Sequence, residues 1–375
     1  MRYFLVAGEA SGDLHASALI RALRAEDPEA SFAFMGGDKM EAAAGVAPIV
    51  HYREVAFMGI VSVVKNLGKL TRIGRQIQAA MRDFAPDVVI PVDYADFNFR
   101  FILPYAKGEL CCPVIYYILP KLWAWRAGRI RQLRRYVDLG LSILPFETSY
   151  FSDRGLRTEY IGNPCVDAKL TYLAEHPEPV EREQMLLLVP GSRQSELRDN
   201  LPEMLAATAA YSQLGWRVVI AGAPGLTAAD YAPHLGKYSD TPILFGETYG
   251  LMRRAHAALV TSGTATLEAG LWGIPMVVCY RMGGRRIARL AFERFFRVPY
   301  FSLVNLILDR PAVPELLADR MEGEELPRTL AELIDEDSSA RARQLKDLTH
   351  LSQRMGTSLS APKAAEAILD FLAKA

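Results

Sequence analysis

The segment Ser262-Gly263-Thr264 joins an apolar run to a helical pattern, and its residue types suit anion binding. Residues 257–260 have the length and apolarity of a buried parallel strand, while Leu267, Leu271 and Trp272 recur at helical spacing. The free N–H groups at the start of such a helix, with the positive end of its dipole, form an anion site. Ser and Thr also cap ordinary α/β helices, so these residues by themselves leave that alternative open.

Glu268 and a second glycine turn extend this pattern. Glu268 lies four residues beyond Thr264, on the same face of the predicted helix, and its carboxylate suits a ribose diol better than a phosphate. Pro190-Gly191-Ser192-Arg193 is a glycine turn that follows the predicted strand 186–189 and opens a helix. The C-terminal half thus repeats the order of strand, glycine turn and helix.

The chain begins with the same order of elements. Residues 3–7 form a predicted strand, residues 8–13 (GEASGD) a loop, and Leu14 to about Ala25 a helix. The loop lacks both the GxGxxG spacing of dinucleotide folds and the GK[ST] of a Walker motif, so NAD and ATP are weak candidates. Strand 32–35 also ends in glycines, and two such loops should meet at the carboxyl edge of one sheet, where open α/β sheets bind ligands.

Two carboxylates, Asp93 and Asp96, follow the predicted strand 87–92 at this same edge. Three residues apart in a loop, they could act as a general base and its orienting partner. They could also cap the next helix, which is the commoner role of an acid at such a position. A role in the site therefore needs independent support.

Two basic segments are open to two interpretations each. The first has no acid between Glu54 and Asp83 and combines apolar residues with the basic residues Lys65, Lys69, Arg72 and Arg75. A membrane-surface helix and an ordinary solvated helix account for it equally well. The second, residues 120–135, interleaves Trp123 and Trp125 with arginines. It could grip a phosphorylated or lipid-headgroup ligand, or contain a buried Trp pair beside a solvated helix.

Length and composition bound the elements that must position these residues. The 375 residues favour two domains, and the alternation of strands with helices favours an α/β architecture. Lys plus Arg equals Asp plus Glu at 43 each, which argues against a nucleic-acid partner. The four cysteines form no CxxC pair, so neither zinc nor a disulfide framework is indicated. No signal peptide or membrane-spanning run is evident, which predicts a cytoplasmic soluble protein with surface attachment still open.

The pattern divides the chain into four parts. We expect an N-terminal Rossmann-like domain at 1–170, a linker rich in Glu and Pro at 171–185, a second Rossmann-like domain at 186–344 and a helical tail at 345–375. Two facing α/β domains would leave a cleft between them for a small molecule.

Eight strings spread over both halves carry a family resemblance. They are AGEASGD (7–13), MGIV (58–61), DYADFN (93–98), WAWR (123–126), LPFE (144–147), PGSR (190–193), SGTATLE (262–268) and MVVCYRM (276–282). In this order and spacing they resemble lipid-A-disaccharide synthase nearly from end to end. The resemblance implies an α/β fold of the GT-B type with C-terminal helices that can cross back to the first domain.

The activity implied by the resemblance is an inverting glycosyl transfer that uses no metal and no cofactor. It would join UDP-2,3-diacylglucosamine to 2,3-diacylglucosamine 1-phosphate, releasing UDP and forming the β-1,6-linked disaccharide of lipid A. A UDP-sugar epimerase of the same fold and a nonenzymatic lipid or nucleotide carrier are the alternatives.

The resemblance also assigns site residues. Asp96 is implied as the general base, although the choice between it and Asp93 stays open. The acceptor side would be lined by Glu9, Ser11 and Asp13. In the UDP site, the diphosphate would meet Arg193, Ser262, Gly263 and Thr264, the ribose would meet Glu268, and Asn305 matches a family site asparagine.

Two positions depart from the family pattern. Residues 161–164 (IGNP) lack the histidine that often follows the glycine, and the first loop reads GEASGD where many members have GETSGD. Asp335-Glu336-Asp337 is the only Asp-x-Asp string, and its polar surroundings indicate a solvated helix end. Arg193, helix N-terminal amides and Arg281 are expected to stabilise departing UDP instead.

Four acyl chains on the two substrates would give the first basic segment a purpose. Its predicted membrane-facing or lipid-facing residues are Phe57, Met58, Ile60, Val61, Val64, Lys65, Lys69 and Arg72. We expect a cytoplasmic protein peripheral to the inner face of the inner membrane, and the resemblance suggests a homodimer.

Overall fold

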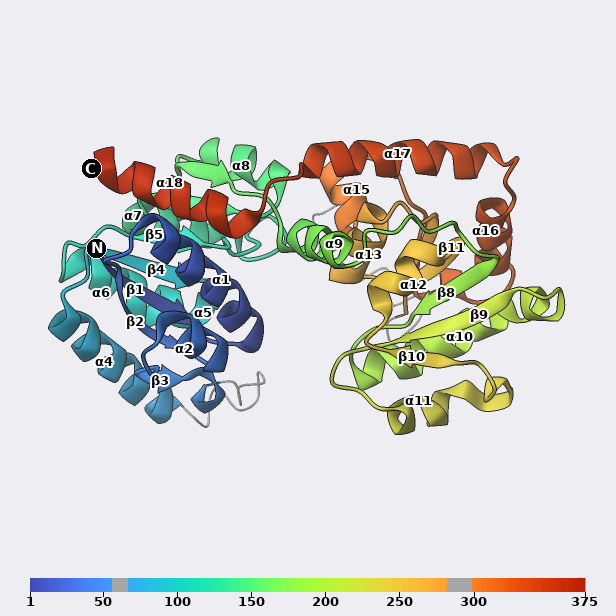
Figure 1. The fold of residues 1–375 in the computed structure, drawn as a ribbon, viewed down its shortest axis with the longest axis horizontal. Helices are drawn as coiled ribbons and strands as arrows, with labels where there is room; N and C mark the ends of the chain where they lie inside the picture. Colours follow the sequence, from blue (N-terminus) through green and yellow to red (C-terminus); the bar gives the residue numbers. More distant parts are fainter. Residues whose placement is uncertain (56–66, 282–298, 375) are drawn as a thin grey trace. The chain divides into compact units, whose positions relative to one another are not determined.

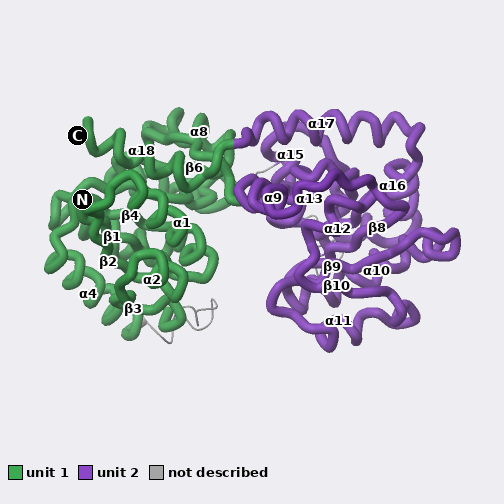
Figure 2. The backbone as a smooth tube through the Cα atoms, viewed as in Figure 1, with its two compact units in different colours: residues 1–164, 358–375 green, residues 165–357 purple. Residues whose placement is uncertain are grey.

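The computed structural model describes residues 1–55, 67–281 and 299–374. Its chain forms two compact units (Figure 2). Unit 1 contains residues 1–164 and 358–375, and unit 2 contains residues 165–357. The chain therefore leaves unit 1 once and returns to it at its C-terminal end. The expected tail boundary at 345 falls inside α17 (Ser339–Met355), and the expected linker overlaps α9 (Pro164–Glu175).

Within the described residues, unit 1 is built on a sheet of seven parallel strands in the order β3-β2-β1-β4-β5-β6-β7 (Figure 1). The strands are β1 (Arg2–Ala7), β2 (Ser31–Gly36), β3 (Val50–His51), β4 (Val88–Val92), β5 (Ile115–Tyr117), β6 (Leu139–Ser142) and β7 (Thr158–Tyr160). The inner strands read as continuous apolar runs because helices cover both faces of the sheet. The order reverses between β1 and β4, so loops after these two strands diverge and leave room for a ligand.

The helices of unit 1 connect and cover these strands. They are α1 (Ala10–Glu26), α2 (Asp38–Ala44), α4 (Leu67–Phe84), α5 (Ala95–Phe97), α6 (Leu103–Gly108), α7 (Ile130–Tyr136), α8 (Pro145–Ser152) and α18 (Ser360–Lys374), with short 3-10 turns at Tyr52–Glu54 and Ala127–Arg129 and a π-helical turn at Asn98–Ile102. On α4, Ile73, Ile77 and Met81 are buried at helical spacing, while the basic residues face solvent.

The second sheet, in unit 2, has six parallel strands among the described residues, in the order β10-β9-β8-β11-β12-β13. The strands are β8 (Met185–Val189), β9 (Arg217–Gly222), β10 (Ile243–Phe245), β11 (Ala257–Thr261), β12 (Met276–Tyr280) and β13 (Glu315–Leu317). The described helices of unit 2 are α9, which begins at the last residue of unit 1, α10 (Gln194–Gln213), α11 (Ala228–Leu235), α12 (Thr248–Arg254), α13 (Thr264–Leu271), α15 (Leu303–Leu308), α16 (Glu325–Ile334) and α17, with 3-10 turns at Gly236–Tyr238 and Ala318–Met321. Here the order reverses between β8 and β11. The expected architecture of two Rossmann-like domains is confirmed.

The last helix, α18, packs against α1 and so completes unit 1 (Figure 1). Ala364, Ala365 and Ile368 are fully buried in the core cluster that also contains Leu19 and Ile20 of α1. The predicted return of a C-terminal helix to the first domain is therefore confirmed.

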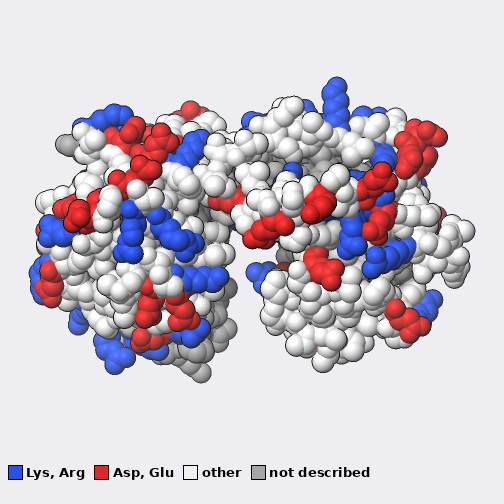
Figure 3. Space-filling model, in the orientation of Figure 1, with Lys and Arg blue, Asp and Glu red and all other residues white. Residues whose placement is uncertain are grey.

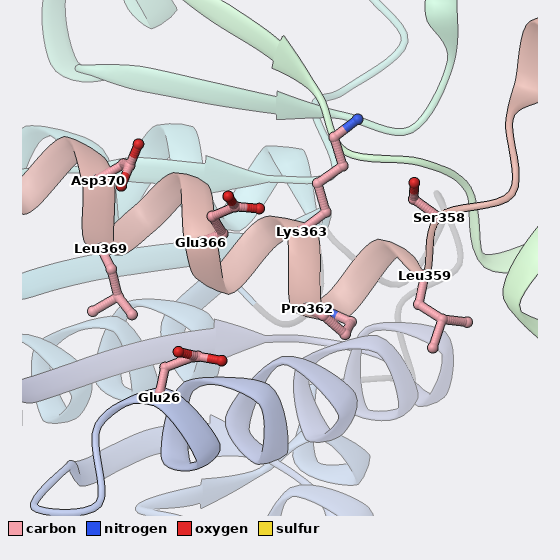
Figure 4. A pocket seen from close by; sticks show the side chains of 8 residues that line it. All are labelled: Glu26, Ser358, Leu359, Pro362, Lys363, Glu366, Leu369 and Asp370. Carbon is pink, nitrogen blue, oxygen red and sulfur yellow. The ribbon is translucent and has the colours of Figure 1, made fainter.

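A groove of about 680 Å³ runs between α18 and the C-terminal end of α1 (Figure 4). Figure 4 shows Glu26 entering it from α1, with the carboxylates of Glu366 and Asp370 projecting from α18. Glu26 is the one lining residue from α1, and the others come from α18 and the two residues before it.

Candidate active site

In unit 2, the loops after β8, β9 and β11 line one cavity of about 340 Å³ at the carboxyl edge of the sheet. Five of the predicted UDP-binding residues line it, namely Arg193, Ser262, Gly263, Thr264 and Glu268. Because they come from two separate loops, only the parallel sheet brings them together. The cavity lies at the point where the strand order reverses, which is the usual ligand position in such folds.

The turn at Pro190–Arg193 is shaped by Glu196. The Glu196 carboxylate accepts hydrogen bonds from the Ser192 and Arg193 N–H groups at 2.8 and 3.3 Å and from the Arg193 guanidinium at 2.6 Å. Gly191 has a φ of 114°, and a Cβ there would lie 2.4 Å from the Glu196 carboxylate. The Glu196 side chain is 15% exposed but that of Arg193 is 77% exposed. Glu196 thus fixes the turn and leaves Arg193 facing solvent in the cavity. The sequence contains a signal for this role of Glu196, because an acid three residues after the N-cap is typical of a capping box.

The turn at 262–264 leads directly into α13. Gly263 is the N-cap with a φ of 149°, and no side chain caps the helix. Capping by Ser or Thr is therefore the wrong interpretation for this helix. The Ser262 hydroxyl instead donates to the Phe301 carbonyl at 3.1 Å, and Thr264 is exposed. The first N–H groups of α13 consequently remain available at the cavity wall.

Glu268 has a neighbour that the sequence did not reveal. The Tyr249 hydroxyl, from α12, donates to one Glu268 oxygen at 2.6 Å. Burial, then the charge of Glu268, raises the pKa of Tyr249, so the phenol stays a proton donor. Tyr249 therefore orients the carboxylate. Nothing in the spacing of residues 249 and 268 indicates this pair.

Asn305 is buried and acts on the site through hydrogen bonds to a neighbouring loop rather than by lining the cavity. Its side-chain amide donates to the Val313 carbonyl at 2.9 Å and to the Glu315 carboxylate at 2.8 Å. Glu315 in turn accepts from the Phe301 and Ser302 N–H groups. Because Phe301 also accepts from Ser262, the Asn305 network positions the 262–264 turn without lining the cavity.

Arg281 is occupied elsewhere in unit 2. Its guanidinium pairs with Glu203 at 2.7 Å and with Glu322 at 2.8 Å, and it does not line the cavity. The Asp335–Asp337 string follows the last residue of α16, with Asp335 as its C-cap. The interpretation of that string as a helix end is confirmed.

In unit 1, the predicted acceptor-side residues lie in the loop after β1 and the first turn of α1. Ser11 donates a hydrogen bond to the Glu9 carboxylate at 2.7 Å, and both residues are exposed. Asp13 is buried and accepts from the N–H groups of Gly37, Lys39 and Met40 at 2.7 to 3.1 Å. Asp13 therefore caps α2 and holds two loops together, whereas Glu9 and Ser11 face solvent.

Asp93 and Asp96 follow β4, next to that loop, because β4 pairs with β1. Asp96 is 70% exposed and pairs with Arg126 at 2.7 Å and with Arg129. Partial burial disfavours its charge, but the bonds and charges of the two arginines prevail and lower the pKa of Asp96. The helix α5 has Tyr94 as its N-cap and no side-chain cap. Capping, which the pattern alone favoured, is therefore the wrong interpretation for this pair.

The two tryptophans of residues 120–135 differ in their surroundings. Trp123 donates to the buried Glu147 carboxylate at 2.8 Å, and Ser142 donates to its other oxygen at 2.6 Å. Trp125 is 58% exposed, with the Arg126 guanidinium 4.7 Å from its ring. A buried Trp pair is therefore wrong, and an exposed aromatic and basic surface is present beside Asp96.

The predicted lipid-facing set is only partly visible. Lys69 and Arg72 are exposed on α4, whereas Phe57, Met58, Ile60, Val61, Val64 and Lys65 lie outside the described residues. Figure 3 shows basic and acidic side chains interspersed on the face in view. No helix in the described parts of the chain has the length and apolarity needed to cross a bilayer.

Comparison with solved structures supports the fold. A UDP-GlcNAc 2-epimerase from Neisseria meningitidis aligns over 100% of both chains with a TM-score of 0.65 and 13% identity. CalG4, the calicheamicin glycosyltransferase, aligns over 100% of this chain and 99% of its own with a TM-score of 0.62 and 16% identity. At these identities the similarity concerns the fold alone.

Comparison with sequences is more specific. A protein from Myxococcus xanthus named lipid-A-disaccharide synthase is 37% identical, with 99% of this chain and 97% of the relative covered. One from Rhodospirillum centenum with the same name is 33% identical, with 99% and 94% covered. Residues 3–369 also match the family model described as lipid-A-disaccharide synthetase. The chain thus belongs to the lipid-A-disaccharide synthase family.

Proposed function

We propose that this protein joins UDP-2,3-diacylglucosamine to 2,3-diacylglucosamine 1-phosphate, giving the β-1,6-linked lipid A disaccharide 1-phosphate and UDP. The observation that carries this proposal is the cavity in unit 2. An exposed arginine, a helix N-terminus and an oriented carboxylate line that single cavity, and these groups suit the diphosphate and ribose of a UDP-sugar.

The donor is bound through opposite charges and hydrogen bonds. Arg193 pairs with the diphosphate, the N–H groups and hydroxyls of 262–264 donate to its oxygens, and Glu268 accepts from the ribose. Asn305 contributes indirectly, because its hydrogen bonds with Glu315 fix the loop that contacts Ser262.

Departure of UDP is helped by fixed protein groups. Negative charge develops on the diphosphate as the sugar bond breaks, and Arg193 with the start of α13 stabilises it. Removing one preorganised donor of this kind typically costs about 3 kcal/mol of transition-state stabilisation. Arg281 is assigned no part in this step because it pairs with Glu203 and Glu322.

The acceptor hydroxyl attacks the anomeric carbon in a single displacement, which inverts its configuration. A carboxylate after β4 takes the hydroxyl proton. The family resemblance assigns this role to Asp96, whose arginine partners keep it ionised. Glu9 and Ser11 are exposed in the neighbouring loop and contact the acceptor sugar.

Both substrates are acylated, so the protein works at a membrane surface. The exposed Lys69 and Arg72 on α4 attract anionic headgroups. The apolar part of the contact is assigned to Phe57, Met58, Ile60, Val61 and Val64. We also propose a homodimer, as the resemblance implies.

The test is a single-turnover assay of the purified protein with both acylated sugars. We expect UDP and the disaccharide in equal amounts, and no change in UDP-acetylglucosamine when it is supplied alone. Epimerisation of that sugar without an acceptor, with no disaccharide formed, would overturn the proposal.

A further inference from the structure

Arg126 and Arg129 join the segment after β5 to the loop after β4. Both guanidiniums bind the Asp96 carboxylate, that of Arg126 at 2.7 Å, although 30 and 33 residues separate them from it in the sequence. The contact arises because β4 pairs with β5 through Val92 and Tyr117, so the two loops leave the same edge of the sheet side by side. Open α/β sheets bind their ligands at this carboxyl edge.

The two arginines carry more positive charge than Asp96 neutralises. Two guanidiniums share one carboxylate, so the group of three keeps one positive charge. Both of their bonds end on the same oxygen of Asp96, Oδ1. Each guanidinium has five N–H donors in a rigid fork, so each can bind a further anion while it still holds Asp96. The side chains of Arg126 and Arg129 are 46% and 26% exposed, so such an anion can reach them from solvent.

Aromatic rings hold both guanidiniums in place. The Arg129 guanidinium lies 5.0 Å from the centre of the buried Phe99 ring, and that of Arg126 lies 4.7 Å from the centre of the Trp125 ring. Arg126 also has a φ of 54°, a left-handed conformation that is unfavourable for residues other than glycine and that recurs at functional sites. The pair is therefore ordered before a ligand binds, which lowers the entropy cost of binding.

The proposed acceptor carries one anionic group, the phosphate on C1 of its sugar. Arginines match a phosphate because their parallel N–H groups bind two of its oxygens at once. Residues 121–135, which include both arginines, contain no acid that would repel it. The C1 phosphate and the C6 hydroxymethyl group are attached to the two carbons that flank the ring oxygen. One compact group of side chains can therefore contact both ends of the reacting part of the acceptor.

We propose that Arg126 and Arg129 bind the 1-phosphate of the acceptor and so make the transfer specific for a phosphorylated sugar. This inference rests on the proposed function. The acceptor 6-hydroxyl gives its proton to the second oxygen of Asp96, Oδ2, and its oxygen forms the bond to the anomeric carbon, while the electron pair of the breaking bond leaves with UDP. The phosphate offsets part of the arginine charge, so Asp96 accepts this proton more readily once the acceptor is in place.

The test compares two acceptors in neutral detergent micelles, 2,3-diacylglucosamine 1-phosphate and the same sugar without the phosphate. For the unaltered protein we expect kcat/KM to be at least a hundredfold higher with the phosphorylated acceptor, because two charge-assisted hydrogen-bonding groups contact the phosphate. Arg126→Gln and Arg129→Gln should each lower this ratio at least tenfold. Arg154→Gln should leave it unchanged and is a matched control, since Arg154 is exposed in the same unit and its guanidinium lies 3.9 Å from the centre of the Tyr150 ring.

The ratio of the two kcat/KM values isolates the phosphate contact, because damage to Asp96 or to folding slows transfer to both acceptors. Where a variant transfers too slowly to measure, equilibrium binding of the two acceptors gives the corresponding ratio of Kd values. An unaltered protein that does not distinguish the two acceptors would overturn the inference. A ratio in both arginine variants equal to that of Arg154→Gln would overturn it as well.

Phosphate groups of membrane lipids are the other source of the same chemistry. If the arginines bind those groups instead, Arg126→Gln and Arg129→Gln would weaken binding to anionic vesicles and leave the ratio of the two acceptors unchanged, which would overturn the inference. Absence of transfer to either acceptor by the unaltered protein would instead refute the proposed function.

Discussion

Arg193 and Glu196 form an ion pair in which the two members have different surroundings. The carboxylate is mostly buried and holds three groups of the 190–193 turn, whereas the guanidinium is mostly exposed. An incoming diphosphate can therefore bind the arginine without dismantling the turn. This division of roles explains why Gly191 must lack a side chain.

We expect Arg193→Ala to weaken UDP binding by about 10- to 100-fold, because a hydrogen bond to a charged group contributes roughly 1.5 to 3 kcal/mol. Titration calorimetry with UDP measures the change. Arg217→Ala serves as the control, since Arg217 begins β9 at the opposite edge of the sheet and pairs with Glu183 on the surface. Equal UDP affinities of the two variants would show that Arg193 does not bind the donor.

At the scale of elements, Glu147 joins the loop after β5 to the first turn of α8. Burial raises the pKa of Glu147 to about 7, although the bonds from Ser142 and Trp123 favour its ionised form. The folded protein thus binds this proton more tightly than the unfolded chain does. The resulting stabilisation is fully present below about pH 4.5 and is lost as the pH rises to about 7.

Replacing Glu147 by Gln should remove this pH dependence. The free energy of unfolding of the unaltered protein minus that of Glu147→Gln should fall by about 3 kcal/mol between pH 4.5 and pH 7. This difference should stay constant above pH 7. Urea unfolding at several pH values measures it. Glu159→Gln on β7 provides the control, because that carboxylate is 42% exposed. A constant difference between Glu147→Gln and the unaltered protein would contradict the prediction.

The contact between α18 and α1 allows a second stability test. Ile368 is fully buried, so Ile368→Ala should lower the free energy of unfolding by about 2 to 5 kcal/mol. Its neighbour Leu369 lines the groove and is only partly buried. Leu369→Ala should therefore cost much less in the same urea titration. Similar losses for both would mean that α18 does not pack on α1 through its Ile368 face.

The central elements could be predicted from sequence, because buried parallel strands form apolar runs that end in glycine turns. The strand predicted at 257–260 is one residue longer in the structure, and the strand predicted at 186–189 begins one residue earlier. The edge strands β3 and β13 were missed, since two or three residues containing His or Glu give no apolar run. Pairs such as Tyr249 with Glu268 depend on tertiary packing and have no signal in spacing.

The candidate site was predictable to a similar extent. Residues at strand ends, such as Arg193 and Glu268, lie where their motifs indicate. Asn305, Asp13 and Arg281 were also expected in the site, but other parts of the folded chain engage them in hydrogen bonds or ion pairs. Only the folded structure distinguishes a polar side chain that lines the cavity from one that holds the cavity wall in place.

At the scale of the whole molecule, equal numbers of basic and acidic residues mean that membrane binding depends on local patches rather than net charge. We expect Lys69→Glu combined with Arg72→Glu to weaken binding to anionic vesicles at least tenfold, because each basic residue contributes about 1 kcal/mol. Sedimentation at two salt concentrations measures binding, which should also weaken as salt rises. Reversal of Arg343 and Lys346, exposed on α17, is the control; equal effects of both pairs would contradict a patch on α4.

The placement of α18 has a consequence for synthesis of the protein. Unit 1 takes its first 164 residues from the start of the chain and its last helix from the end. While the ribosome is still making unit 2, the apolar face of α1 that Ala364, Ala365 and Ile368 will cover has no partner from its own chain. The first half to be translated is therefore the last to be finished, and it is the half that a chaperone would need to shield.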